Sequence, residues 1–247
     1  MNRTSIAFIF LALIAGFVIG FLLANKLNGS EMASLRAKAG QQNTENSNQS
    51  QNPSDTTLSN EELRAKIIEA DKNPDNLTYQ KNLGVSLYRY ASMKQDNELL
   101  TESIRILTRA NSLDAKDFDV LVALGNAHFD VGFFKKDTAS FQTARELYTK
   151  ALDLKPGDAD VRTDFGLTYF LQEPPAYEKA AAELQQVLAA NPKHDRAMQF
   201  LVQTYVKQGK LAEAERMLAK IIEINPTNPV ITDLRSQISA AQSGVSK

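Results

Sequence analysis

Residues 195–228 read DRAMQFLVQTYVKQGKLAEAERMLAKIIEINPTN, and the spacing of apolar residues in this stretch decides the fold. Leu201 and Tyr205 lie four residues apart, which places both side chains on one face of a helix. Further along, apolar residues recur at intervals of four and three: Ala214, Leu218 and Ile221. Pro226 ends this second run because a proline cannot continue a helix. The stretch therefore predicts two helices joined by a turn.

The same spacing recurs upstream, so this stretch is one of four units in the 247-residue chain. Three earlier segments place glycine at one position of the first helix, 41 residues apart each time: Gly84, Gly125 and Gly166. The second helices repeat in the same way. In each unit an apolar residue is followed five residues later by alanine or proline: Ala110 with Ala115, Ala151 with Pro156, Val187 with Pro192, and Ile221 with Pro226. Glycine inside a helix costs about 1 kcal/mol relative to alanine, so its recurrence predicts a close approach of the two helices in each unit.

This pattern of Leu-Gly-x-x-Tyr, then spaced alanines and large apolar residues, then a proline resembles the tetratricopeptide repeat (TPR). Residues 195–228 match its 34-residue length, with Val202 in place of the usual glycine, and the resemblance covers about residues 59–240. It implies an all-α fold over residues 59–242, a right-handed TPR superhelix (α-solenoid) of four helix-hairpin repeats with capping helices. The second unit has seven extra residues, and because Gly132 keeps its consensus place we expect residues 133–139 in or after the turn.

One further helix is expected at each end of the repeats. Ser59 and Glu62 form the pattern of a capping box, which opens a helix that ends before Pro74. Because Pro74 lies 41 residues before Ala115, this helix is the second half of an incomplete unit. Pro229 opens the last helix. Such terminal helices close the exposed ends of a stack of hairpins.

Residues 1–27 have the composition of an N-terminal transmembrane anchor. No charge occurs from Thr4 to Asn25, and about 20 apolar residues span the ~30 Å hydrocarbon core of a bilayer. The alternative is a cleavable signal peptide, whose apolar region is usually about 7–15 residues long and ends at a small-x-small site. The run here is longer and lacks a good site, which favours the anchor. Residues 28–58 are expected to be a disordered polar linker, since they hold too little apolar surface to fold.

Two properties of the anchor stay open. Small residues recur along one face, where a second helix could approach closely: Ala12, Gly16, Gly20 and Ala24. A homo-oligomer assembled through this face competes with the fact that glycine and alanine are common in membrane helices. Lys26, Arg36 and Lys38 after the span favour a cytoplasmic repeat domain, whereas the short N-terminal flank and the absence of cysteine favour the extracytoplasmic, periplasmic side. We expect a single-pass membrane protein in the latter orientation, with the cytoplasmic one as the alternative.

The first helices of such a stack line its concave groove, which repeat proteins use as a binding surface. The residues expected there are Lys81, Tyr88, Asn126, Phe129, Phe170, Arg196, Gln199 and Gln203. Tyr88, Phe129 and Phe170 are 41 residues apart, and a row of aromatics suits apolar side chains of a peptide. The alternative is that these aromatics pack against neighbouring helices. Some TPR domains hold a terminal carboxylate with lysine and asparagine, but three of the places that such a clamp needs are occupied by Val85, Thr163 and Leu167.

Catalytic chemistry finds little support in the sequence. The chain has no cysteine, which excludes thiolate metal sites and thiol nucleophiles. His128 stands where the other units have leucine or tyrosine, which predicts a core side chain, and His194 beside Asp195 suits the surface between repeats. The net charge of −1 gives no basic footprint for a nucleic acid. We therefore expect no enzyme activity, cofactor, metal ion or nucleic-acid partner.

The expected function is that of a membrane-anchored protein–protein interaction module: an adaptor, assembly scaffold or chaperone-like holder with a peptide or protein in its groove. Similar anchored repeat proteins in bacteria assist envelope complexes, including cytochrome c biogenesis, and the resemblance implies such a role at the level of the family. Two alternatives remain, a structural membrane oligomer assembled through the small-residue face and a non-catalytic subunit of an enzyme complex.

Overall fold

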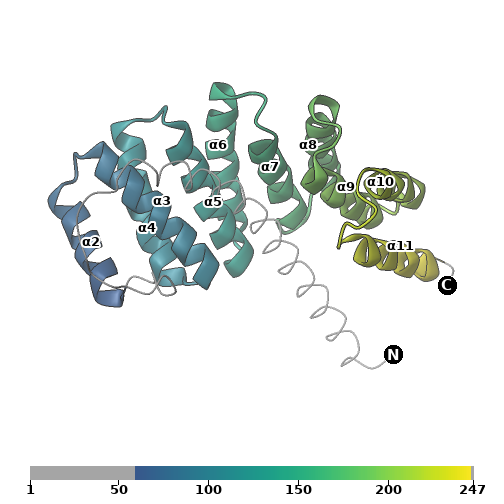
Figure 1. Cartoon of the computed structure of the whole chain (residues 1–247), viewed down its shortest axis with the longest axis horizontal. Coiled ribbons are helices and arrows are strands. Elements are labelled where there is room, and N and C mark those ends of the chain that lie inside the picture. The colour runs from purple at the N-terminus through teal and green to yellow at the C-terminus, as the bar shows by residue number, and fades with distance from the viewer. Residues whose placement is uncertain (1–58, 246–247) are drawn as a thin grey trace, which may run out of the picture. The chain divides into compact units, whose positions relative to one another are not determined.

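The computed structural model describes residues 59–245, and this part of the chain is entirely helical, as predicted (Figure 1). Its ten helices are α2 (Asn60–Lys72), α3 (Leu77–Lys94), α4 (Asn97–Leu113), α5 (Phe118–Lys135), α6 (Thr138–Leu154), α7 (Ala159–Leu171), α8 (Tyr177–Ala190), α9 (Asp195–Lys207), α10 (Leu211–Ile224) and α11 (Ile231–Val245). The predicted anchor and linker, residues 1–27 and 28–58, lie outside the described residues. Between Ser59 and Val245, none of the helices combines the length and the apolar character that a membrane span requires.

The helices pack as hairpins in chain order (Figure 1). The four hairpins are α3 with α4, α5 with α6, α7 with α8, and α9 with α10. Their first helices also contact one another, α3 against α5, α5 against α7 and α7 against α9. α2 packs against α3 at one end, and α11 packs against α9 and α10 at the other. The described residues thus form four hairpins between a preceding half-unit and a closing helix.

Each first helix begins at a residue whose side chain accepts a hydrogen bond from the backbone of the first turn. These N-caps are Asn76, Asp117, Asp158 and His194. They are 41, 41 and 36 residues apart, the same intervals that separate the glycine positions and Val202. His194 accepts from the backbone N–H of Ala197 through Nδ1 at 3.2 Å. It therefore starts a helix, because an N-cap satisfies a backbone donor that would otherwise have no partner in the helix.

The extra residues of the second unit lengthen its helices. α5 and α6 contain 18 and 17 residues, whereas α9 and α10 contain 13 and 14. The sequence predicts residues 133–139 in or after the turn, but residues 133–135 continue α5 and only Lys136 and Asp137 separate the helices. Gly132 is helical, and a Cβ atom on it would lie 2.9 Å from the ring of Phe141. Gly132 thus allows close contact between α5 and α6 and does not form the turn. The left-handed turn conformation is taken by Lys136, with φ of 53°.

The recurrent glycines lie where the two helices of a hairpin approach closely. A Cβ atom on Gly84 would lie 2.8 Å from Leu107 Cγ, and one on Gly125 would lie 2.7 Å from Tyr148 Cε1. At Gly166 the nearest atom is Glu183 Cβ at 3.2 Å, so this third contact is looser. The close approach predicted from the recurrence of glycine is therefore tightest in the first two hairpins.

The prolines of the repeat follow the second helices. Pro156, Pro192 and Pro226 each come two residues after the last residue of α6, α8 or α10. Ala151, one turn before the end of α6, is fully buried. Because a proline cannot donate to the backbone ladder, these residues fix the point at which the second, third and fourth hairpins end.

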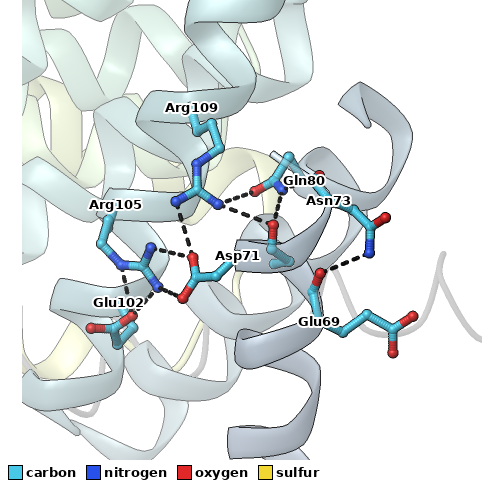
Figure 2. A network of polar contacts seen from close by, with 8 residues as sticks. Glu69, Asp71, Asn73, Gln80, Glu102, Arg105 and Arg109 are labelled. Carbon is cyan, nitrogen blue, oxygen red and sulfur yellow. Dashed lines mark hydrogen bonds and ion pairs between the residues drawn. The ribbon is translucent and has the colours of Figure 1, made fainter. Parts of the chain in front are cut away.

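Polar contacts tie α2 to the first complete hairpin (Figure 2). Asp71 of α2 forms ion pairs with Arg105 and Arg109 of α4, at 2.6 and 3.0 Å. Arg109 Nη1 and Gln80 Nε2 both donate to the backbone carbonyl of Ala70, at 3.1 and 2.7 Å. The backbone N–H of the C-cap residue Asn73 donates to the same carbonyl at 3.3 Å, so these side-chain bonds reinforce the C-terminal end of α2.

Candidate functional site

The first helices α3, α5, α7 and α9 lie side by side and carry the residues that the sequence assigns to a binding surface. The predicted residues are Lys81, Tyr88, Asn126, Phe129, Phe170, Arg196, Gln199 and Gln203. Together with Ser92, Asp130 and Asp164, which the structure adds on the same helices, they define what we call the first-helix face.

The three equivalent aromatics of this face differ in burial. Phe129 is only 6 % exposed and packs edge-on against Phe141, with ring centroids 5.6 Å apart. Tyr88 and Phe170 are partly exposed, and Phe170 also packs against Tyr177 at 5.4 Å. Phe129 thus lies in the core between the second hairpin's helices, whereas Tyr88 and Phe170 keep surface that a ligand can contact.

Lys81 forms ion pairs with neighbouring side chains. Its Nζ donates to Asp117 and Asp119 of the next repeat, at 2.8 Å in each ion pair. Burial lowers the pKa of Lys81, but these hydrogen bonds and charges outweigh it and hold the pKa above its ordinary value. Lys81 therefore bridges α3 to the start of α5.

Two of the three polar amides of the face, Asn126 and Gln199, have partners inside the chain. Asn126 Oδ1 accepts a hydrogen bond of 2.7 Å from the Tyr148 hydroxyl. Gln199 Nε2 donates to a carboxylate oxygen of Asp195, one turn earlier in α9. Gln203 is partly exposed on the same helix. Of these amides, Asn126 is the one that orients an aromatic ring of a second helix.

Arg196 of α9 pairs with Asp164 of α7. Their side chains are 21 % and 17 % exposed, so the ion pair is largely shielded from water. Burial raises the pKa of Asp164, and the Arg196 guanidinium opposes that shift. The pair joins the third and fourth hairpins through charge.

Asp130 of α5 is the most unusual residue of the face. It is 3 % exposed, and its Oδ2 atom has no hydrogen-bond partner. Burial raises its pKa to about 7, against 3.8 for an ordinary aspartate. Hydrogen bonding from the side chains of Ser92 and Tyr88 opposes this shift, while the charge of Asp164 adds to it. At neutral pH the folded chain therefore holds Asp130 close to half protonated.

The pKa values of Tyr88 and Tyr148 are shifted by the same buried surroundings as that of Asp130. Burial raises the pKa of Tyr88 well above its ordinary value, and the charges of Asp130 and Asp164 raise it further. Burial likewise raises the pKa of Tyr148, with Asp164 and Asp130 among the contributing charges. Two carboxyl groups, two phenol groups and Arg196 therefore interact across five helices, α3, α5, α6, α7 and α9. We call Tyr88, Ser92, Asp130, Asp164 and Arg196 the Asp130 cluster.

Sequence reasoning missed Asp130, although a signal was present. The equivalent positions of the other three units hold Arg89, Leu171 and Lys207. Asp130 is the single acidic residue at that position, and it falls in the most apolar of the first helices. An acidic side chain among apolar neighbours predicts a buried carboxyl group, which proteins seldom keep without a partner.

The histidines do not form a metal site. Burial lowers the pKa of His128, which is only partly buried in α5 and not fully in the core as its place in the repeat predicts. His194 Nε2 lies 3.2 Å from Asp160 Oδ1 while Nδ1 caps α9. Within the described part of the chain, no three histidine, aspartate or glutamate side chains gather so as to hold a metal ion.

Comparison with known protein families finds the tetratricopeptide repeat at residues 176–238, which span α8 to α11. The comparison with curated proteins finds no match. The family match covers the unit whose spacing needs no insertion.

Solved structures extend the likeness over most of the described helices. A tetratricopeptide repeat protein from Parabacteroides merdae is 21 % identical with a TM-score of 0.58, over 74 % of this chain and 65 % of its own. A thermophilic TPR protein from Thermus thermophilus, TTC0263, is 20 % identical with a TM-score of 0.52, over 73 % and 89 % of the two chains. MamA is 23 % identical with a TM-score of 0.53, over 66 % and 80 %. With the landmarks of all four hairpins in register, residues 176–238 match the tetratricopeptide repeat family and the described helices have the fold of tetratricopeptide repeat proteins.

Proposed function

We propose that this chain is a protein-binding module whose first-helix face holds a peptide segment of a partner protein. The observation that carries the proposal is the partial exposure of Tyr88 and Phe170 at equivalent positions of two hairpins. Aromatic side chains contribute large contact areas to protein interfaces with little loss of conformational entropy. The TPR fold, which is that of protein–protein interaction modules, supports the same role.

The proposed binding mode is that of an extended or helical peptide lying across α3, α5 and α7. Tyr88 and Phe170 would contact its apolar side chains, and the partly exposed Asn126 and Gln203 would hydrogen-bond to its polar groups. Such a surface would recognise apolar side chains spaced at regular intervals along the peptide, as other peptide-binding grooves do. The proposal assigns no catalytic step to the chain.

We further propose that this module is held at a membrane. Residues 1–27 would anchor the chain, residues 28–58 would act as a tether, and the repeats would lie on the extracytoplasmic side. A holder in that position would assist assembly of an envelope complex, of which cytochrome c biogenesis is one candidate. The support is the uncharged apolar run from Thr4 to Asn25 together with the family resemblance.

The binding role is tested by removing the two exposed aromatics. In the full chain, Tyr88→Ala with Phe170→Ala should lower the amount of partner recovered from solubilised membranes about tenfold or more, since aromatic anchors dominate interface energy. The measurement is quantitative mass spectrometry of crosslinked and co-purified proteins.

A matched control removes exposed apolar side chains from second helices. Leu154 and Ile224 are 41 % and 43 % exposed in α6 and α10. Leu154→Ala with Ile224→Ala should leave recovery of the partner unchanged. If the aromatic pair also leaves the same partners at the same yield, capture on the first-helix face is wrong and self-assembly through the anchor becomes the better explanation.

The side of the membrane is tested with one introduced cysteine. The chain has none of its own, so Ser50→Cys provides a single reactive thiol just before the repeats. A membrane-impermeant maleimide should label this thiol in intact spheroplasts to the same extent as in lysed ones. Labelling only after lysis would place the repeats in the cytoplasm.

A further inference from the structure

The carboxyl group of Asp130 has no cationic partner among the described residues. The groups that act on it are Ser92 and Tyr88 of α3 and Asp164 of α7, none of which carries a positive charge. The charge of Asp130 in turn helps to raise the pKa of Tyr148 of α6. The nearby cation, Arg196, is already bound to Asp164. The guanidinium thus compensates Asp164 and leaves Asp130 without a compensating charge.

Such an arrangement is costly unless something else supplies the missing charge. An ionised carboxylate loses hydration when it is buried, and a partner cation with good hydrogen-bond geometry offsets that loss. Oδ2 of Asp130 also lacks a donor, so it has acceptor capacity that the chain does not use. A ligand with a positive charge and N–H donors would supply both the missing charge and the missing hydrogen bond.

We propose that Asp130 receives the basic side chain, lysine or arginine, of the peptide bound on the first-helix face. This inference rests on the proposed peptide-binding function and specifies its ligand. The cationic head would donate to Asp130, and its aliphatic stem would pass along the partly exposed ring of Tyr88. Because Oδ2 is buried, a charge carried inward on a long stem fits better than a compact hydrated ion.

The charge balance gives the interaction a pH dependence. In the free chain the pKa of Asp130 is about 7, so part of the population is protonated at neutral pH. A bound cation favours the ionised form and lowers that pKa, so binding releases a proton. The affinity for a basic peptide should therefore rise from pH 6 to pH 8. Tyr88, Tyr148, Asp164 and Arg196 face the same carboxyl group, but Arg196 and both tyrosines keep their charge state over this range.

The test is selection from a random heptapeptide phage library on the full chain, immobilised in detergent micelles at pH 8. Three proteins are compared: the unmodified chain, Asp130→Asn, and Asp153→Asn, which removes the same charge from an exposed position of α6. The unmodified chain and Asp153→Asn should enrich peptides with lysine or arginine at one fixed position, and Asp130→Asn should not. A selected peptide should lose about tenfold in affinity when its basic residue becomes norleucine.

That loss should be absent in Asp130→Asn and smaller at pH 6 than at pH 8 in the unmodified chain. Selected peptides without a basic preference, or peptides bound equally by Asp130→Asn, would overturn the inference and leave the peptide-binding function standing. Failure of all three proteins to select any peptide would instead overturn both. Circular dichroism checks the fold of each variant, and the norleucine peptide tests the contact even if Asp130→Asn does not fold.

Discussion

Asparagine in place of Asp130 is expected to stabilise the folded chain by roughly 2–4 kcal/mol at pH 8. The folded state raises the pKa of this carboxyl group from 3.8 to about 7. Between these two values the folded chain keeps a proton that the unfolded chain has lost, so stability falls as the pH rises toward 7 and stays low above it. Asparagine has nearly the same shape and no charge, so it removes this penalty.

Urea unfolding of the full chain in detergent at pH 4.5 and pH 8 measures this effect. The variant should gain most at pH 8 and little at pH 4.5, where the native carboxyl group is protonated in the folded state. Asp153→Asn serves as the control and should change stability by less than about 0.5 kcal/mol at either pH, as is usual for surface substitutions. An equal gain at both pH values would show that the charge of Asp130 is not the cause. A residue that costs stability is often kept for binding, which agrees with the ligand proposed for it.

Alanine in place of Gly125 is expected to destabilise the chain by about 2 kcal/mol, even though alanine favours helices by about 1 kcal/mol. The added methyl group would lie 2.7 Å from Tyr148 Cε1 and 2.9 Å from its Cδ1. Tyr148 cannot move away easily, because it is 1 % exposed and its hydroxyl is bonded to Asn126. The loss should appear as a lower urea midpoint with an unchanged slope.

Gly166→Ala provides the matched comparison at the equivalent position of the third hairpin. Its methyl group would lie 3.2 Å from Glu183 Cβ, a contact that a shift of a few tenths of an ångström relieves. The gain in helix preference should then balance the crowding, and stability should change by less than about 1 kcal/mol. If both variants lose the same stability, packing against the second helix does not explain the recurrent glycines.

Much of the fold followed from spacing, because a hairpin repeat imposes the same constraints in every unit. The intervals between Gly84, Gly125, Gly166 and Val202 predicted four hairpins, and the three glycines predicted the close contact inside the first three. The extra residues of the second unit were misplaced because Gly132 suits either a turn or a tight helix contact. The ring of Phe141 on the next helix decides between them, because it leaves no room for a Cβ atom at position 132. A rule based on local turn residues does not include this contact.

The surface was less predictable than the fold. Position in the repeat assigned Tyr88, Phe129 and Phe170 to one face, but it could not tell which ring a neighbouring helix covers. Phe129 is covered because the ring of Phe141, in the first turn of α6, packs edge-on against it. Asp130 escaped notice because its importance lies in what surrounds it in space, namely side chains of α3 and α7.

The polar attachment of α2 has a mechanical consequence. Asp71 is 43 % exposed and Arg105 is 38 % exposed, so dissolved salt weakens their attraction. In a stack whose members touch only their neighbours, an outer member can detach while the others stay folded. A force applied from the N-terminal side acts on α2 first. This helix can therefore detach before the hairpins that carry Tyr88 and Asp130 are disturbed.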